Sequence, residues 1–322
     1  MTTRARYVEL AQVERSGLLE GVHHGAVVVL GEDGTVLMAA GDPDQLIYPR
    51  STNKPMQAAG MVRAGLHLPA DELALVGASH DGEPGHVAGA RAILARHGLD
   101  ETALQNTPGF PGHEPSRLAV IRDGRGRESV TGDCSGKHAG MLATCVVNGW
   151  DVGTYLQPDH PVQQCMRAEL ETLAGEPVAH TGVDGCGAPA WAITLTGLAR
   201  AFAACTTATS DQPARQVADA MRAHPEMVGG TDRDVTAFMR AVPGLLAKEG
   251  AEAVYAAALP DGRAVALKIA DGAFRAAQVV LAEALAVAGV GRASLLALST
   301  VPVRGQGRRV GDVTALPLSA YQ

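Results

Sequence analysis

The segment Ser51-Thr52-Asn53-Lys54 places a hydroxyl and an amine three residues apart. Pro55 follows at once, and because proline is tolerated only in the first turn of a helix, a helix is expected to begin close to Ser51. Residues three apart on a helix share a face, so the Ser51 hydroxyl and the Lys54 amine could touch. A lysine that has lost its proton can activate a serine as a nucleophile. Taken alone, a pattern this short is better explained as a helix cap followed by a solvated lysine.

Lysine is rare in this chain: only four of its 27 basic residues are lysines. A lysine in such a sequence is expected where arginine cannot serve, because only the lysine amine readily gives up its proton when buried. Lys248, in the polar segment AKEGAE, is expected to be an ordinary surface residue. Lys54, Lys137 and Lys268 lie in unusual local sequences and are candidates for chemistry.

Lys268 lies in the apolar segment AVALKIA, which is typical of a strand. Side chains alternate along a strand, so Lys268 shares a face with Ala264 and Ala266 and leaves room for a substrate or a catalytic helix. An exposed sheet face with one extended lysine explains the pattern equally well. A serine-lysine pair followed by a late strand lysine is also the arrangement of penicillin-recognising serine enzymes. The S-D-N and K-T-G triplets of those enzymes are not evident, which argues against a β-lactamase.

Two cysteine segments, GDCSGKHAGML and VDGCGAP, could bind a metal ion. Cys134 and Lys137 precede an expected helix, whose N-terminus would stabilise a thiolate, and Cys186 lies in a Gly-Cys-Gly turn. Two thiolates could hold zinc, but no spacing here supplies a complete set of ligands, and a Cys134–Cys186 disulfide remains an alternative. The other cysteines are interpreted as small buried apolar residues: Cys145, Cys165 and Cys205.

The segment GASHDGEPGH contains a further serine, Ser79, in a polar turn between an apolar run and an expected helix. Its His80, Glu83 and His86 lack the H-E-x-x-H order of a zinc protease. Taken alone, the segment is interpreted as the entry to a helix.

The elements that must position these residues follow an α/β pattern. Apolar runs at 25–31 and 35–40, and again at 254–259 and 264–270, flank turn residues and predict two hairpins. Helices are expected near residues 85–97, 137–148, 161–174, 212–223 and 273–288. Strands at both ends with helices between predict a single α/β domain over residues 1–322, whose antiparallel sheet joins the N- and C-terminal segments around a helical region.

Composition excludes several classes of protein. The chain has 322 residues, of which 46% are hydrophobic, so it can bury a large core. A net charge of -7 argues against nucleic-acid binding, and the arginine clusters at 122–127 and 304–309 are expected in solvated loops. Residues 1–17 lack the apolar region of a signal peptide, and no stretch reaches the roughly 18 apolar residues of a membrane span. Five cysteines without C-x-x-C spacing favour free thiols or metal ligands, so a cytoplasmic location is expected.

Five segments occur together in the order seen in the asparaginase II family of the Rhizobium etli type. They are YPRSTNKPMQ, ASHDGEPGH, GDCSGKHAGML, VDGCGAP and the strand that carries Lys268. The resemblance extends from about residue 7 to about residue 318. The bacterial asparaginases with threonine nucleophiles are a different family.

The resemblance implies hydrolysis of L-asparagine to L-aspartate and ammonia, by a homodimer with a fold similar to that of serine β-lactamases and glutaminases. Carried over by motif, it implies two serine-lysine pairs, Ser51 with Lys54 and Ser79 with Lys268. Of the two serines, Ser51 is favoured as the nucleophile because its lysine is one helical turn away.

The same resemblance implies a zinc site and substrate contacts. The zinc ligands would be Cys134, Lys137 and Cys186, and the substrate contacts would be Arg50, His138 and Asp184. Three other functions remain open. They are a serine-lysine acyl hydrolase for glutamine or a β-lactam, an amino-acid-binding protein without activity, and a thiolate metal-storage protein. The retained lysines argue against the last two, since neither binding nor storage needs a neutral amine.

Overall fold

The computed structural model describes residues 6–321. Residues 1–5 and Gln322 lie outside the described residues, although the predicted domain 1–322 includes them. Residues 1–5 are also the start of the segment in which no signal peptide is expected. The chain forms two compact units. The first comprises the described residues up to Thr52, Ile193–Thr207 and the residues from Ala237 onward, and the second comprises Asn53–Ala192 and Ala208–Thr236.

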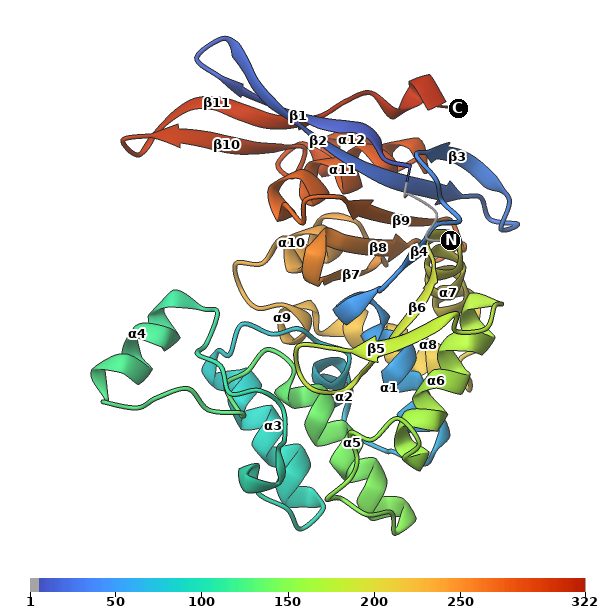
Figure 1. Ribbon diagram of the computed structural model, residues 1–322, viewed down its shortest axis with the longest axis vertical. Coiled ribbons are helices and arrows are strands. Elements are labelled where there is room, and N and C mark those ends of the chain that lie inside the picture. Colours follow the sequence, from blue (N-terminus) through green and yellow to red (C-terminus); the bar gives the residue numbers. More distant parts are fainter. Residues whose placement is uncertain (1–5, 322) are drawn as a thin grey trace. The chain divides into compact units, whose positions relative to one another are not determined.

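The first unit is built on an eight-stranded antiparallel sheet with the order β10-β11-β1-β2-β9-β8-β7, in which β3 pairs with β2. The N-terminal strands β1 and β2 lie beside the C-terminal strands β10 and β11 (Figure 1), so both ends of the chain contribute to one sheet. The strands are β1 (Val8–Arg15), β2 (Leu18–Leu30), β3 (Val36–Ala40), β7 (Leu246–Gly250), β8 (Val254–Ala258), β9 (Ala264–Ile269), β10 (Thr300–Gly305) and β11 (Arg308–Ala315).

The core of this unit lies around β2 and β9. Residues 26–30 of β2 are all fully buried, which means that both faces of the sheet are covered there. Helices α7 (Leu195–Thr207) and α11 (Phe274–Val287) pack against these strands. Short helices complete the unit: η1 (Arg50–Asn53), of which only the last residue belongs to the second unit, η3 (Ala251–Ala253), α12 (Arg292–Leu295) and η4 (Leu318–Tyr321). The predicted sheet of N- and C-terminal segments is therefore confirmed, including the hairpins β2–β3 and β8–β9.

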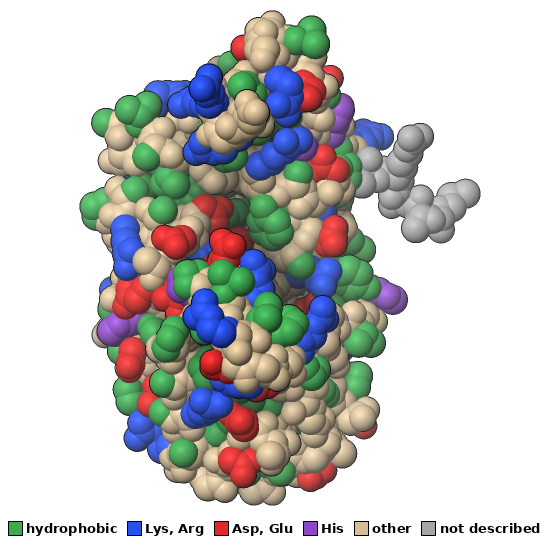
Figure 2. All heavy atoms as spheres, turned by 90° about the vertical axis from the view of Figure 1, so that its left-hand side faces the viewer, with side chains coloured by type: hydrophobic (Ala, Val, Ile, Leu, Met, Phe, Trp, Pro, Cys, Tyr) green, Lys and Arg blue, Asp and Glu red, His purple; other side chains and the backbone are tan. Residues whose placement is uncertain are grey.

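Basic side chains gather at the tips of the hairpins β1–β2 and β10–β11, at the top of Figure 2. Arg15, Arg304, Arg308 and Arg309 are exposed there. Arg304, Arg308 and Arg309 lie at strand ends rather than in the expected loop, but their exposure agrees with the expected solvated charges.

The second unit is mainly helical. Its helices are α1 (Lys54–Arg63), α2 (Ala70–Val76), α3 (Pro84–Arg96), η2 (Glu101–Ala103), α4 (Glu114–Arg122), α5 (Ser135–Asn148), α6 (Pro161–Ala174), α8 (Pro213–Ala223) and α9 (Pro225–Val228). Strand β5 (His180–Val183) pairs with the first residues of β6 (Pro189–Thr194) in this unit, and the last two residues of β6 pair with β4 (Leu46–Ile47) in the first unit. Helix α10 (Asp234–Ala241) also contains a boundary between the units.

Close helix packing in the second unit depends on a glycine in α5. A Cβ atom on Gly136 would lie 2.4 Å from the backbone oxygen of Leu75 and 2.6 Å from its Cγ atom. Only glycine lets the first turn of α5 approach the end of α2 this closely. The same turn carries Lys137 and His138, so the glycine helps to place them.

The expected helices are confirmed within one or two residues at their ends. The expectation for Lys248 is wrong: it is fully buried in β7, where its Nζ atom donates to the backbone oxygen of Glu249 at 2.6 Å. A buried ammonium must be compensated, and the Glu249 carboxylate lies 3.4 Å away. Among the described residues, none of the helices has both the length and the apolar character of a membrane span.

Candidate active site

Lys54 is the first residue of α1, and the chain enters this helix through η1 with Pro55 in the first turn. The Lys54 side chain is almost completely buried. Its Nζ atom donates to the backbone oxygen of Ala78 at 2.6 Å and to the Ser79 hydroxyl oxygen at 3.0 Å. The lysine therefore contacts a serine 25 residues further along the chain.

Ser79 lies in the loop between α2 and α3 and is also buried. A buried hydroxyl at hydrogen-bond distance from an amine is the arrangement needed for a lysine to take the proton of an attacking serine. The sequence did not predict this contact, because the two residues come from separate elements that meet only in the folded unit.

The serine-lysine pairs expected from the resemblance are Ser51 with Lys54 and Ser79 with Lys268. Both pairs stay predictions, because each joins a residue of the first unit to a residue of the second. Ser51, half-buried in η1, belongs to the first unit and Lys54 to the second. Likewise, Lys268 belongs to the first unit and Ser79 to the second.

A second group of reactive side chains surrounds the start of α5. Cys134 is the residue before the helix, and Cys186 lies in the turn between β5 and β6. The two sulfur atoms and a ring nitrogen of His138 all lie within 4.8 Å of one another. Lys137 donates from its Nζ atom to the Cys186 sulfur at 3.3 Å. The structure thus brings together the three residues expected as zinc ligands and adds a histidine to them.

The two cysteines differ in protonation. The hydrogen bond between them holds the pKa of Cys186 well below its usual range, and the Lys137 ammonium adds to this effect. The same hydrogen bond, with burial, raises the pKa of Cys134. Burial alone would lower the pKa of Lys137, but the two cysteine sulfurs and Asp184 raise it. The group therefore contains a thiolate at Cys186 beside a charged lysine.

His138 is placed by a residue that sequence reasoning missed. Its Nδ1 atom lies 2.8 Å from the Tyr155 hydroxyl, which also accepts a hydrogen bond from the backbone nitrogen of Gln105 at 3.0 Å. Burial lowers the pKa of His138 to about 4, so the ring is neutral near pH 7. Tyr155 is one of only five tyrosines, but nothing in its local sequence marks it.

The chemistry of this group fits a zinc ion. Zinc in proteins is held by cysteine sulfur and histidine nitrogen in sets of three or four ligands. The Nε2 atom of His138 is buried without a well-formed hydrogen bond, which is unusual for a polar atom inside a protein. A neutral imidazole with one nitrogen held by Tyr155 and the other without a well-formed hydrogen bond is suited to metal binding.

Asp184, expected as a substrate contact, lies in the turn before Cys186. Its carboxylate accepts a hydrogen bond from the backbone nitrogen of Gly185 at 2.7 Å. This bond fixes the turn that presents the Cys186 sulfur, so Asp184 has at least a local structural role.

The first unit holds the other expected residues, Arg50 and Lys268, in one cavity of about 290 Å³ that Tyr48 and Glu252 also line. The Lys268 amine donates to the backbone oxygens of Glu252 and of Ile269, the latter at 2.7 Å. Burial lowers the pKa of Lys268, and the nearby Arg50 charge adds to this effect. The carboxylates of Glu252 and Asp271 would raise the pKa, but the net shift is downward.

Arg50 and Glu252 have backbone φ angles of 54° and 62°, a conformation that residues with side chains rarely adopt. Such conformations cost of order 1–3 kcal/mol each and gather at functional sites. The cavity around Lys268 is therefore a second candidate region for substrate binding.

Of the comparisons with known proteins, one shows a family. No curated protein matches the chain by sequence. Among solved structures, a β-lactamase from Mycobacterium bovis is similar at 17% identity with a TM-score of 0.42, over 85% of this chain and 94% of that chain. Mglu in its tris and glutamate form is similar at 15% identity with a TM-score of 0.45, over 83% of this chain and 60% of that chain. Likenesses at this level say nothing about the chemistry of the site. The family model described as L-asparaginase II matches residues 11–315, nearly the whole chain, and this protein therefore belongs to the L-asparaginase II family of amidohydrolases.

Proposed function

We propose that the protein hydrolyses L-asparagine to L-aspartate and ammonia through a serine acyl-enzyme. The observation that carries the proposal is the buried hydrogen bond of 3.0 Å between the Lys54 amine and the Ser79 hydroxyl, in a chain of the L-asparaginase II family. A plain binding protein has no need of an amine that can accept the proton of a serine.

The proposed reaction is a double displacement. The neutral Lys54 amine takes the proton of a serine hydroxyl while the serine oxygen bonds to the side-chain amide carbon. The tetrahedral intermediate then breaks its carbon–nitrogen bond, and ammonia leaves with a proton returned by Lys54. Water attacks the resulting ester, and the free serine and L-aspartate are released.

Two serines are candidates for the attack. Ser79 is supported by its contact with Lys54, and Ser51 by the S-x-x-K motif. In this proposal, Lys268 is the second base, because its lowered pKa leaves more of it neutral near pH 7 than an ordinary lysine. Arg50, His138 and Asp184 remain the proposed substrate contacts.

Zinc belongs to the proposal through Cys134, Lys137 and Cys186, with His138 as a further residue that could hold it. When bound, zinc would help to hold the substrate rather than activate water, because two thiolates neutralise much of its charge. Metal analysis of the reduced protein is expected to give one zinc per chain. A Cys134–Cys186 disulfide and no metal would contradict this part of the proposal.

The homodimer is also part of the proposal, and it rests on the family resemblance alone. Light scattering of the purified protein at several concentrations is expected to give twice the mass of one chain. A mass of one chain throughout would contradict it.

The function is tested by ammonia release from L-asparagine, with L-glutamine in parallel. Release from asparagine is the expected result, and release from asparagine alone would make the enzyme specific for it. Equal release from both would make the protein a broader amidase. No release from folded, zinc-loaded protein would overturn the proposed reaction.

A further inference from the structure

The position of Ser79 depends on a segment that is distant in sequence, residues 226–233. The backbone nitrogen of Ser79 donates to the oxygen of Val228 at 3.0 Å, and that of Asp81 donates to the oxygen of Gly229 at 2.8 Å. Ser79 itself is in a loop, so no helix or strand of its own fixes its hydroxyl. The segment 226–233 therefore acts as an external support for the Ser79 loop.

This support has little stiffness of its own. It passes from the single turn of α9 into Gly229 and Gly230, and Gly230 has a φ of 133°, which only glycine adopts without strain. A Cβ atom on Gly230 would lie 2.9 Å from a carboxylate oxygen of Glu83. Two consecutive glycines favour many unfolded conformations, so the segment needs side-chain anchors to keep one conformation.

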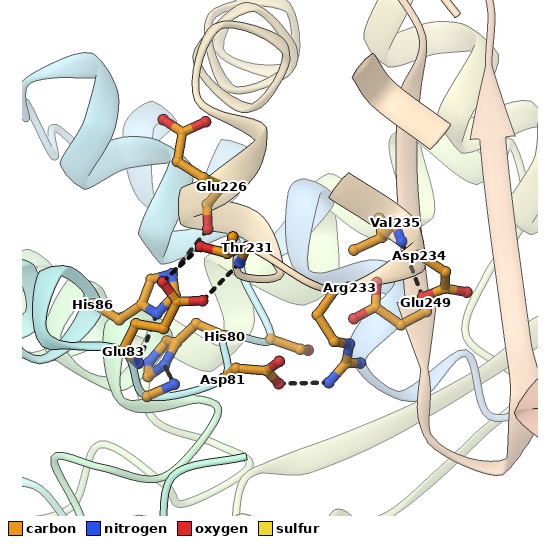
Figure 3. Close-up of polar contacts among 12 residues, drawn as sticks. His80, Asp81, Glu83, His86, Glu226, Thr231, Arg233, Asp234, Val235 and Glu249 are labelled. Atoms are coloured by element: carbon orange, nitrogen blue, oxygen red, sulfur yellow. Dashed lines mark hydrogen bonds and ion pairs between the residues drawn. The ribbon is translucent and has the colours of Figure 1, made fainter. Parts of the chain in front are cut away.

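Glu83 supplies the main anchor. Its carboxylate accepts two hydrogen bonds from Thr231, one from the backbone nitrogen at 2.6 Å and one from the hydroxyl at 3.0 Å (Figure 3). Hydrogen bonds to an ionised group are roughly twice as strong as those between neutral groups. Because Glu83 is only four residues after Ser79, the anchor acts on the same loop that carries the serine.

Two further contacts fasten the same two segments together (Figure 3). Arg233 donates from Nη1 to the Asp81 carboxylate at 2.7 Å, and His86 Nε2 donates to the backbone oxygen of Glu226 at 2.8 Å. His86 Nδ1 accepts a hydrogen bond from the backbone nitrogen of Glu83 at 3.0 Å, which leaves the proton on Nε2 for that contact. The support is thus attached at its beginning, middle and end.

We propose that Glu83, through Thr231, is a positioning residue that holds segment 226–233 against the Ser79 loop and so keeps the Ser79 hydroxyl at the Lys54 amine. The inference rests on the proposed serine-lysine chemistry. In this inference Ser79 is the attacking serine and Lys54 its base, and Glu83 acts on them only through the backbone of the supporting segment. Small displacements of a reacting group are costly, since a shift of about 1 Å can lower the rate roughly 100-fold.

The test compares variants that differ only in this anchor. Glu83→Ala removes both hydrogen bonds, Thr231→Val removes the hydroxyl bond alone, and Thr231→Ser keeps both. Glu101→Gln is a control outside the anchor, because Glu101 is an exposed glutamate paired with Arg91 in the same unit. Thermal unfolding of each variant shows whether it folds.

With asparagine as substrate, kcat is expected to fall roughly 10- to 100-fold in Glu83→Ala and less in Thr231→Val, with KM nearly unchanged. Thr231→Ser and Glu101→Gln are expected to keep the wild-type kcat. A wild-type kcat in folded Glu83→Ala would overturn the inference. So would a loss in Thr231→Ser as large as in Thr231→Val.

A second readout separates failure of the inference from failure of the proposed function. A fluorophosphonate probe labels an activated serine without any need for an amide substrate, and peptide mapping by mass spectrometry identifies the labelled residue. Labelling of Ser79 is expected to slow in Glu83→Ala but not in Glu101→Gln. No labelling of Ser79 in the wild type, or equal rates in wild type and Glu83→Ala, would overturn the inference. Normal labelling without ammonia release would overturn only the proposed function.

Discussion

Lys54 is the residue on which the proposed chemistry depends, because its amine is the proposed base. It is buried, it donates to a backbone oxygen and to the Ser79 hydroxyl, and it lies close enough to Cys134 to oppose part of the rise in the pKa of that thiol. Its neighbours thus include both a serine and the cysteine group. A single amine could therefore couple serine attack to a substrate held near the thiolates.

Replacing Lys54 by arginine tests its role as a base. Arginine keeps the positive charge and can donate hydrogen bonds, but it does not lose its proton in proteins. Lys54→Arg is expected to lower kcat by about 100-fold or more, as is typical for loss of a general base. Ammonia-release kinetics measure the effect. Arg91→Lys is the control. It exchanges the same two residue types in an exposed ion pair with Glu101, and it should leave kcat unchanged. Substantial turnover in folded Lys54→Arg would show that the amine is not the base.

Glu83 gives a prediction for stability in acid. Partial burial alone would raise its pKa, but the hydrogen bonds from Thr231 and the nearby rings of His86 and His113 lower it below the ordinary value of 4.5. Below about this pH the unfolded chain binds more protons at Glu83 than the folded chain, so the stability that Glu83 supplies is lost as pH falls through its folded pKa.

The measurement is the difference in unfolding free energy between wild type and Glu83→Gln in urea. This difference is expected to be largest above pH 4.5, the ordinary glutamate pKa, and to shrink as the pH is lowered below that value. A difference that stays constant over that range would mean that the charge of Glu83 does not stabilise the fold.

At the scale of elements, the contact between α2 and α5 places the cysteine group. Gly136→Ala would put a Cβ atom within 2.4 Å of the Leu75 oxygen, and the helices would have to move apart. Overpacking of this kind costs typically 1–3 kcal/mol, and zinc affinity should fall because Cys134, Lys137 and His138 are in the displaced turn. Calorimetry and metal titration measure the two effects.

Gly85→Ala is the matched control. Gly85 is also in the first turn of a helix, α3, but a Cβ atom there would meet nothing within 4 Å. Alanine is a better helix former than glycine by about 1 kcal/mol, so this variant is expected to be as stable as the wild type or more stable. Equal effects of the two substitutions would contradict the proposed role of the close approach.

Elements with a strong local signal could be predicted from the sequence, and contacts between elements could not. The helix at 161–174 and the hairpin of β8 and β9 were predicted because apolar periodicity and turn residues mark them. Lys248 was misjudged because its polar neighbours suggest a surface, whereas tertiary contacts bury the whole strand β7. The Lys54–Ser79 contact, the role of Tyr155 and the Glu83–Thr231 anchor all join residues distant in sequence, which no local pattern encodes.

At the scale of the whole molecule, the catalytic candidates are divided between two units of the chain. Lys54, Ser79 and the cysteine group belong to the second unit, and Arg50 and Lys268 to the first. The first unit is assembled from both ends of the sequence, because β1 pairs with β11 and β2 pairs with β9. These two pairings join strands that are more than 200 residues apart, and contacts of this range slow folding.

The central claim is that a serine of this protein forms an acyl-enzyme with asparagine. The most direct measurement is incubation with L-asparagine and hydroxylamine, followed by assay for aspartyl hydroxamate. An acyl-enzyme is expected to divide between water and hydroxylamine, so hydroxamate should form with the wild type and be lost in Lys54→Arg. Ammonia release without hydroxamate would contradict the acyl-enzyme, and absence of both products from folded, zinc-loaded protein would contradict the proposed reaction itself.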